Sequence, residues 1–428
     1  MARRQSAEHP RAPRWFAWVA LCAALLPSLA ACGSESAPDP NEGAKIQWVA
    51  GLPAAGALVV QPTPAPGAAS GAGASGQPTP PAGASAQPTA AVAGVPGSAL
   101  TAEELATYQP NELGMIPIVE YHQFTTNPAE AAQFVRTIDD FRADLQWFYE
   151  HDFYVVPLED IILNRIAAPP GKHPLAITFD DSQAGQFRYL IAADGSVTID
   201  PDSAVGVMEA FYAEHPDFGR GGFFGVLPYA CFDWTAEVAE PEQTAYCAQK
   251  LDFLLASGYE IGNHTLNHVS VQYLDGETFR AEVGGAVEAL QAFNPAIEAN
   301  IFVVPFGMYP AYDTEDGLQQ REWMRSGFDY NGSTVQLIGS LMVGAEWAPA
   351  PVSVNWDMLW IPRIQACDCE AVGGGGYDTW LPTFEALDYM LYVSDGNPQT
   401  VTVPLALPAE LDGLLDESKL GDRELIRY

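Results

Sequence analysis

The amino-acid sequence predicts an α/β domain in which parallel strands alternate with helices in a barrel-like arrangement. Short apolar runs of strand length recur from residue 115 onwards, and segments with apolar residues at helical spacing lie between them. Strands that alternate with helices are typical of parallel sheets, because a parallel connection needs a long crossover. In such folds the chemistry gathers at the carboxyl ends of the strands.

The individual elements are predicted from apolar runs and turn residues. Strands are expected over residues 115–119, 154–157, 175–179, 223–226, 259–261 and 301–304. Helices are expected around residues 141–148, 205–211 and 279–293, where apolar side chains keep helical spacing. Asp202 or Ser203 is expected to cap the second of these helices. Asp194-Gly195 lies between two further strand-like runs and predicts a hairpin turn.

The N-terminal residues have the composition of an export signal. Four arginines within the first 14 residues precede an apolar stretch, residues 15–29, that is too short to span a membrane comfortably. The stretch ends in Leu29-Ala30-Ala31-Cys32-Gly33, which resembles the lipobox of bacterial lipoproteins. Residues 1–31 are therefore expected to be a lipoprotein signal peptide that leaves a lipidated Cys32. An ordinary signal peptide with an incidental cysteine, or a retained membrane anchor, is the alternative.

The rest of the chain divides by composition. Residues 32–98 are rich in Pro, Ala, Gly and Ser and are expected to be a disordered tether, because such a segment cannot bury a core. The globular domain is expected over residues 99–395, and residues 396–428 form a C-terminal extension of unknown role.

Charge and cysteine content limit the possible partners and sites. Lys and Arg number 19 against 54 Asp and Glu, for a formal net charge of -35. This charge argues against nucleic acid or an anionic lipid surface as a partner, and it suits either a solvated surface or a cationic ligand.

Beyond Cys22 and Cys32 there are four cysteines, which can pair in three ways. Cys231 with Cys247 is the favoured disulfide because the two are close in sequence. Cys367 and Cys369 have no CxxC partner, which argues against a zinc cluster there.

Polar residues follow several of the expected strands. Asp180 and Asp181 stand at the end of an apolar, strand-like segment. Burying their charge costs free energy unless a ligand or another residue binds it. A turn or a helix cap is the alternative explanation. His264 and His268 would share one face of a helical turn and so could bind one metal, although surface or capping histidines also show this spacing. One carboxylate and two imidazoles make a catalytic type of metal site, with positions left for water and substrate. Tyr121-His122 and Pro305-Phe306-Gly307 follow two other strands.

Three of these segments resemble the successive motifs of a known family. Leu175-Ala176-Ile177-Thr178-Phe179-Asp180-Asp181, His264-Thr265-Leu266-Asn267-His268 and Pro305-Phe306-Gly307 resemble the motifs of the polysaccharide deacetylases, carbohydrate esterase family four. The resemblance covers about residues 113–366. It implies a deformed (β/α) barrel with about seven parallel strands. It also implies a metal-dependent hydrolase that removes N-acetyl groups from an extracellular or cell-wall amino-sugar polysaccharide.

The resemblance assigns roles to individual residues. Asp180 matches the general base, and Asp181, His264 and His268 match three metal ligands, with zinc as the default metal. Phe306 matches the position whose backbone N–H helps to hold the oxyanion. The chemistry agrees, because a divalent ion polarises the acetyl carbonyl and activates water while a carboxylate takes the proton.

The chain departs from the usual family pattern at two positions. Val303 stands where the family has an arginine that steadies the catalytic aspartate, and no histidine follows His268 to serve as the acid. Tyr121-His122 resembles the permuted arrangement of poly-N-acetylglucosamine deacetylases, which makes His122 the candidate acid; a structural role or a hydrogen bond to the base is its alternative. Ile361-Pro362-Arg363-Ile364 resembles a late segment of the same subgroup, so Arg363 could replace the missing arginine. Ser182 replaces the usual glycine after the aspartates.

Two other functions stay open at this point. An O-acetyl esterase of the xylan type would use the same residues, because the metal site contacts only the acetyl group. A non-catalytic glycan-binding lipoprotein with this fold is the other, and the retention of Asp180, Asp181, His264 and His268 argues against it. The expected partners are a glycan substrate and a membrane, through lipidated Cys32. The expected location is the outer face of the cell membrane, or the periplasm or outer membrane.

Overall fold

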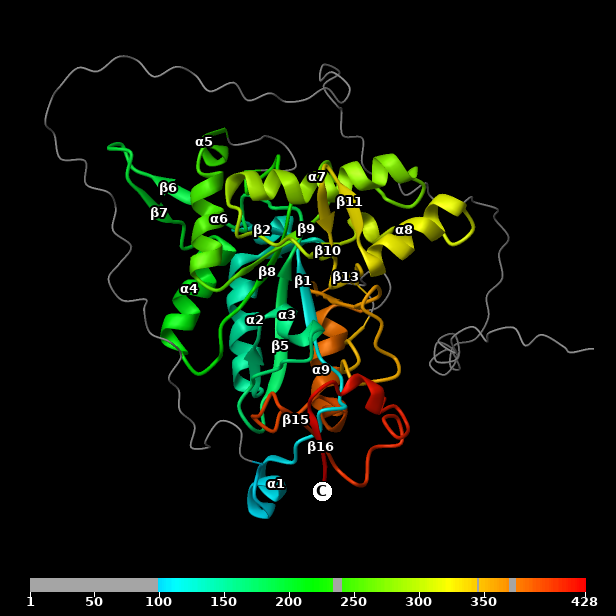
Figure 1. The fold of residues 1–428 in the computed structure, drawn as a ribbon. Helices are drawn as coiled ribbons and strands as arrows, with labels where there is room; N and C mark the ends of the chain where they lie inside the picture. The colour runs from blue at the N-terminus through cyan, green and yellow to red at the C-terminus, as the bar shows by residue number, and fades with distance from the viewer. Residues whose placement is uncertain (1–98, 234–240, 345, 369–374) are drawn as a thin grey trace, which may run out of the picture. The chain divides into compact units, whose positions relative to one another are not determined.

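The computed structural model describes residues 99–233, 241–344, 346–368 and 375–428 of the chain. The predicted signal peptide, Cys32 and the predicted tether lie outside the described residues, as does Cys369. None of the helices in the described ranges has the length and apolar character of a membrane span. The described chain is built around one large sheet with helices outside it (Figure 1).

The principal sheet is parallel and confirms the predicted barrel. Its strands are β1 (Ile118–Tyr121), β4 (Phe153–Val155), β5 (His173–Phe179), β8 (Phe223–Val226), β9 (Glu260–Asn263), β10 (Ile301–Val303), β13 (Gly339–Leu341) and β14 (Ile364–Gln365). Seven of them follow the order β13-β10-β9-β8-β5-β1-β14, and β4 also pairs with β5. A parallel bridge between Leu341 and Ile361 brings the chain before β14 against β13. The sheet therefore curls into a deformed (β/α) barrel.

The helices of the described residues are α1 (Ala102–Tyr108), α2 (Ile138–Glu150), α3 (Leu158–Ile162), α4 (Ala204–Glu214), α5 (Pro241–Thr244), α6 (Cys247–Ala256), α7 (Gly276–Phe293), α8 (Glu315–Ser326) and α9 (Tyr377–Ala386). Most of them lie around the curled sheet, whereas α1 stands apart from it (Figure 1). Helix α2 packs against β4, and α6 and α7 pack against β9 (Figure 1). The N-cap of α4 is Ser203, one of the two residues predicted for this role. Its side chain accepts a hydrogen bond from the N–H of Gly206.

Short two-stranded sheets complete the described fold. They pair β2 (Gln123–Thr125) with β3 (Val135–Thr137), β6 (Tyr189–Ile191) with β7 (Val197–Ile199), β11 (Phe328–Tyr330) with β12 (Ser333–Val335), and β15 (Thr400–Val403) with β16 (Glu424–Arg427). The antiparallel pair β6–β7 is the predicted hairpin, and Gly195 in its turn has a φ of 81°. A positive φ of this kind is what a tight hairpin turn requires of glycine.

The C-terminal residues pack on the barrel. Val401, Val403 and Leu411 are buried in the same core as the barrel strands. The backbone N–H of Thr402 donates to the Glu112 carboxylate at 2.9 Å, ahead of the first strand. Residues after 395 therefore close the end of the barrel where β1 begins.

Candidate metal centre and active site

The polar residues predicted from the sequence lie together at the carboxyl end of the barrel. His122 follows β1, Asp180 and Asp181 follow β5, His264 follows β9, and Phe306 lies in a 3₁₀ turn, Pro305–Gly307, after β10. Strand β5 is buried over residues 174–179, so the chain places charge only where the strand ends. Because these strands belong to one parallel sheet, their carboxyl ends share one edge of it.

Asp181, His264 and His268 form the candidate metal site. The Nε2 atoms of His264 and His268 lie 3.1 Å and 3.3 Å from Oδ1 of Asp181. One ligand atom from each of the three residues lies within 4.8 Å of the others. One carboxylate and two imidazoles with converging ligand atoms fit a catalytic divalent ion. Zinc is the ion that such a set of ligands usually binds.

The orientation of His264 also fits a metal ligand. Its Nδ1 lies 2.9 Å from the carbonyl oxygen of Val303, which can only accept a hydrogen bond. Nδ1 therefore carries a proton, which leaves Nε2, the ring nitrogen on the side of Asp181, as the atom that would bind a metal. Val303, the position that lacks the family arginine, contributes to the site through its backbone.

The path of the chain between the two histidines differs from the prediction. Residues 264–268 form no helical turn, and Thr265 and His268 have φ values of 65° and 52°. Two residues in the left-handed region bend the loop and turn both imidazoles toward Asp181. Asp181 itself has a φ of 75°. Since β5 ends at Phe179, this turn lets two neighbouring aspartates face one site, which a continuing strand would prevent.

Charges in the site set the pKa values of the metal-site residues. Burial raises the pKa of Asp181, but the hydrogen bond with His264 and the nearby imidazoles outweigh it and hold that pKa well below its usual range. Burial and the charge of His264 lower the pKa of His268 to about 4. Asp181 is therefore an ionised carboxylate and His268 a neutral imidazole. Burial lowers the pKa of His264, but the hydrogen bond with Asp181 and the charges of the two aspartates raise it overall, so a metal there would displace a proton.

Asp180 is held by Arg363. Nη1 and Nη2 of Arg363 donate to Oδ1 and Oδ2 of Asp180 at 2.8 Å and 2.7 Å, and both side chains are buried. Burial raises the pKa of Asp180, yet the charge of Arg363 and its hydrogen bonds lower it overall. Arg363 thus makes the contact with Asp180 that the sequence analysis expected of it in place of the missing arginine, and its charge keeps Asp180 ionised.

Glu120 is a site residue that sequence reasoning missed. Its Oε2 lies 2.8 Å from Nη2 of Arg363, so two buried carboxylates share one guanidinium. Burial raises the pKa of Glu120, and the charge of Arg363 offsets only part of this rise. A signal was present, because Glu120 is the one charged residue in the buried strand Ile118–Tyr121. Its partner could not be read from the sequence.

His122 and Phe306 lie on either side of these residues. Nε2 of His122 is 3.7 Å from Oδ2 of Asp180, and its side chain is 14% exposed. The ring of Phe306 is exposed and its centroid lies 4.6 Å from that of His268. Phe306 has a φ of 59°, a conformation that a bulky residue adopts only where its surroundings enforce it. All seven predicted site residues thus lie in one connected cluster.

Comparisons with known proteins agree with this site. The model of the polysaccharide deacetylase family matches residues 230–317, a range that includes His264, His268 and Phe306. No curated protein matches the chain. The parallel barrel thus carries, at the carboxyl ends of its strands, a candidate metal centre beside the buried carboxylate of Asp180. The match over residues 230–317 supports a polysaccharide deacetylase, and this family implies hydrolysis of acetyl groups.

Several solved structures are similar to this chain at low identity. The deacetylase PplD of Streptococcus pyogenes in complex with acetate is 16% identical with a TM-score of 0.40, covering 60% of this chain and 94% of that one. A de-N-acetylase from Aggregatibacter actinomycetemcomitans is 12% identical with a TM-score of 0.41, covering 62% and 98%. IcaB from Ammonifex degensii is 13% identical with a TM-score of 0.37, covering 59% and 91%.

Proposed function

We propose that this protein is a metal-dependent deacetylase that removes N-acetyl groups from an extracellular or cell-wall amino-sugar polysaccharide. The observation that carries the proposal is that a candidate metal site and a buried, ionised carboxylate lie next to each other. Asp181, His264 and His268 converge as metal ligands, and the neighbouring Asp180 is held ionised by Arg363. A base beside a metal site is the arrangement that hydrolysis of an acetyl group requires.

Each residue then has a defined role. A divalent ion held by Asp181, His264 and His268 supplies Lewis-acid polarisation of the acetyl carbonyl and lowers the pKa of water. Asp180 takes the proton of the attacking water, and Arg363 keeps Asp180 oriented and ionised. The backbone N–H of Phe306 stabilises the developing oxyanion. His122, beside Asp180, donates a proton to the departing amine.

The acid role of His122 favours an amide over an ester as substrate. An amine leaves only after it gains a proton, whereas an alkoxide departs with less assistance. His122 lies 3.7 Å from Asp180, so a proton acceptor and a proton donor stand next to each other. O-acetyl esterase activity is the alternative outcome of a substrate comparison.

We also propose that the protein acts outside the cell membrane. The lipobox-like Leu29-Ala30-Ala31-Cys32 supports export and lipid attachment at Cys32. Membrane fractionation of the wild type and of Cys32→Ala tests this: the wild type stays with membranes through salt washing, and the variant is released or remains as a precursor. Wild-type protein that is soluble with an unmodified N-terminus contradicts it.

A product assay tests the catalytic proposal. Protein loaded with zinc is incubated with poly-N-acetylglucosamine, peptidoglycan, chitin oligomers and acetylxylan, and released acetate is measured with and without a chelator. We expect release from an N-acetylated glycan that the chelator abolishes. Release from acetylxylan alone supports the esterase alternative, and release that persists without metal overturns the proposed metal centre.

A further inference from the structure

The loop after β8 occupies a central place at the active-site end of the barrel. Strand β8 lies between β5 and β9, the two strands that lead into Asp181 and His264. The loop begins at Leu227, directly after β8, and carries Tyr229, whose side chain is 50% exposed. The described part of this loop, residues 227–233, therefore begins beside the strand ends that lead into two of the metal-site residues.

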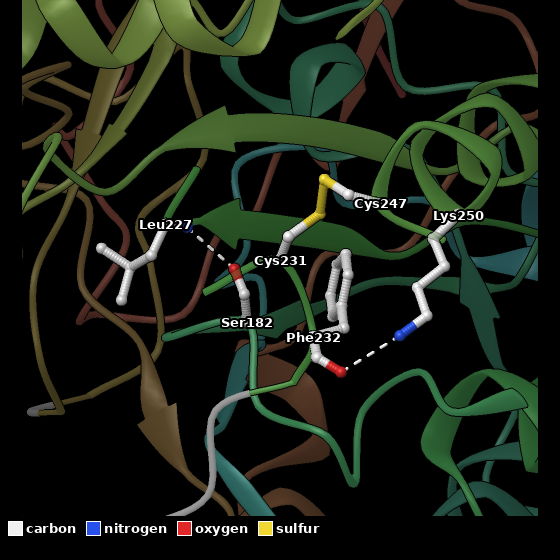
Figure 2. The surroundings of a disulfide bond; sticks show 6 residues. All are labelled: Ser182, Leu227, Cys231, Phe232, Cys247 and Lys250. Atoms are coloured by element: carbon white, nitrogen blue, oxygen red, sulfur yellow. Dashed lines mark hydrogen bonds between the residues drawn. A yellow bond between two sulfur atoms is a disulfide. The ribbon is translucent and has the colours of Figure 1, made fainter. Parts of the chain in front are cut away.

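Three contacts fix this loop to its surroundings (Figure 2). The N–H of Leu227 donates to Oγ of Ser182 at 2.8 Å, next to the metal-site residue Asp181. A disulfide joins Cys231 to Cys247 at the start of α6, as predicted. Nζ of Lys250, also buried, donates to the carbonyl oxygen of Phe232 at 3.1 Å. Ser182 thus has a use that the family's usual glycine could not provide.

The backbone of the loop is held in an uncommon conformation. Cys231 and Phe232 have φ values of 42° and 63°, and both side chains are fully buried. Such conformations are unfavourable for residues other than glycine and persist only where the surrounding structure enforces them. This backbone conformation, the disulfide and buried Lys250 together hold residues 227–233, of which Tyr229 is the exposed one.

The position of Tyr229 on the loop is close to the metal site. Tyr229 follows Leu227 by two residues, Leu227 is hydrogen-bonded to Ser182, the neighbour of Asp181, and the Tyr229 side chain is half exposed. A tyrosine phenol is protonated at neutral pH and can donate a hydrogen bond. Two other exposed aromatic rings border the site, since Phe306 contacts His268 and Phe134 lies with its ring centroid 4.8 Å from that of His122.

We propose that Tyr229 is a substrate-binding residue that selects a sugar ring beside the scissile acetyl group. The flat face of a pyranose presents C–H groups that pack on an aromatic face, and a sugar hydroxyl accepts a hydrogen bond from the phenol. The Cys231–Cys247 disulfide and Ser182 position this ring. The inference rests on the proposed function, and it adds the part of the substrate that the metal site does not contact.

The test measures binding of a sugar and of a sugar-free probe separately. Binding of N-acetylglucosamine hexamer is measured by calorimetry in zinc-loaded Asp180→Asn protein, with and without Tyr229→Ala. Binding of acetate, which lacks a sugar ring, is measured in the same proteins. We expect Tyr229→Ala to weaken hexamer binding roughly 10-fold, and Tyr229→Phe to weaken it less. Acetate affinity and zinc content stay unchanged.

Matched variants separate this role from general destabilisation. The control is Tyr389, another exposed tyrosine. It precedes Met390, whose carbonyl oxygen accepts a hydrogen bond from the N–H of Met115 ahead of β1. Tyr389→Ala is expected to leave hexamer binding unchanged. The Cys231→Ser/Cys247→Ser double variant is expected to weaken hexamer binding like Tyr229→Ala while retaining zinc. If it does not fold, Lys250→Met replaces it. Equal hexamer binding by Tyr229→Ala and its parent overturns the inference. Absence of turnover by the wild type on every glycan overturns the proposed function instead.

Discussion

Arg363 donates two parallel hydrogen bonds to the carboxylate of Asp180, although 183 positions separate the two residues in the chain. Its Nη1 also donates to Oγ1 of Thr178 at 3.0 Å, and its Nε donates to the carbonyl oxygen of Met342 at 2.6 Å. A fork of this kind fixes the carboxylate in orientation as well as in charge. Arg363 is therefore the central positioning residue of the site.

Replacement of Arg363 is expected to reduce both stability and turnover. Arg363→Met leaves the carboxylates of Asp180 and Glu120 buried without a cation, which costs about 3–5 kcal/mol of unfolding free energy. Arg363→Lys keeps the charge but loses the fork, so it is expected to fold better and still turn over slowly. Denaturant unfolding and acetate release measure the two effects. Wild-type turnover in folded Arg363→Lys contradicts the positioning role.

The two neighbouring aspartates are expected to respond differently to the same change. Asp180→Asn keeps the metal and loses turnover by about 10²–10⁴-fold, because a base has been removed. Asp181→Asn loses the metal, because a neutral amide is a poor ligand beside two imidazoles. Elemental analysis and acetate release on the same samples distinguish the variants. The assignment is wrong if Asp180→Asn is the variant that loses the metal.

Removal of the proposed acid is expected to affect amides more than esters. His122→Ala retains zinc and loses about 10²–10⁴-fold in turnover of an N-acetylated oligomer, with a smaller loss on an O-acetyl ester. His215→Ala, a histidine at the end of α4, is the control. Equal losses on both substrates would leave His122 with a structural role, and near-normal amide turnover would remove it from the mechanism.

Glu260 is expected to make stability depend on pH. Its carboxylate accepts hydrogen bonds from the N–H groups of Leu158 and Glu159 at the start of α3. Burial nonetheless raises the pKa of Glu260 to about 7. Because the folded pKa exceeds the unfolded value, the stabilising contribution is full below about pH 4.3 and is lost as the pH rises through 7.

The measurement is denaturant unfolding between pH 5 and pH 8. Relative to Glu260→Gln, which does not titrate, the wild type should lose on the order of 2–3 kcal/mol across this range. Glu277→Gln on the exposed first turn of α7 serves as a control and should follow the wild type. A parallel pH dependence of the wild type and Glu260→Gln contradicts the prediction.

Much of the local chemistry could be predicted from the sequence. Apolar runs predicted the strands, and the charge at their ends marked Asp180 and Asp181 as residues that need a partner. The spacing of Cys231 and Cys247 favoured the disulfide that the structure contains. These features are readable because each depends on a few residues that are close in the chain, where side-chain periodicity and turn chemistry act directly.

Which of these residues contact one another depends on the tertiary structure. Strand order brings β14 beside β1 and places Arg363 between Asp180 and Glu120, and no local pattern encodes that contact. The bend between His264 and His268 follows from left-handed residues whose conformation the surrounding fold enforces, so a helical reading of their spacing failed. Burial and long-range pairing supply the energies that fix such contacts, and both exist only once the barrel has closed.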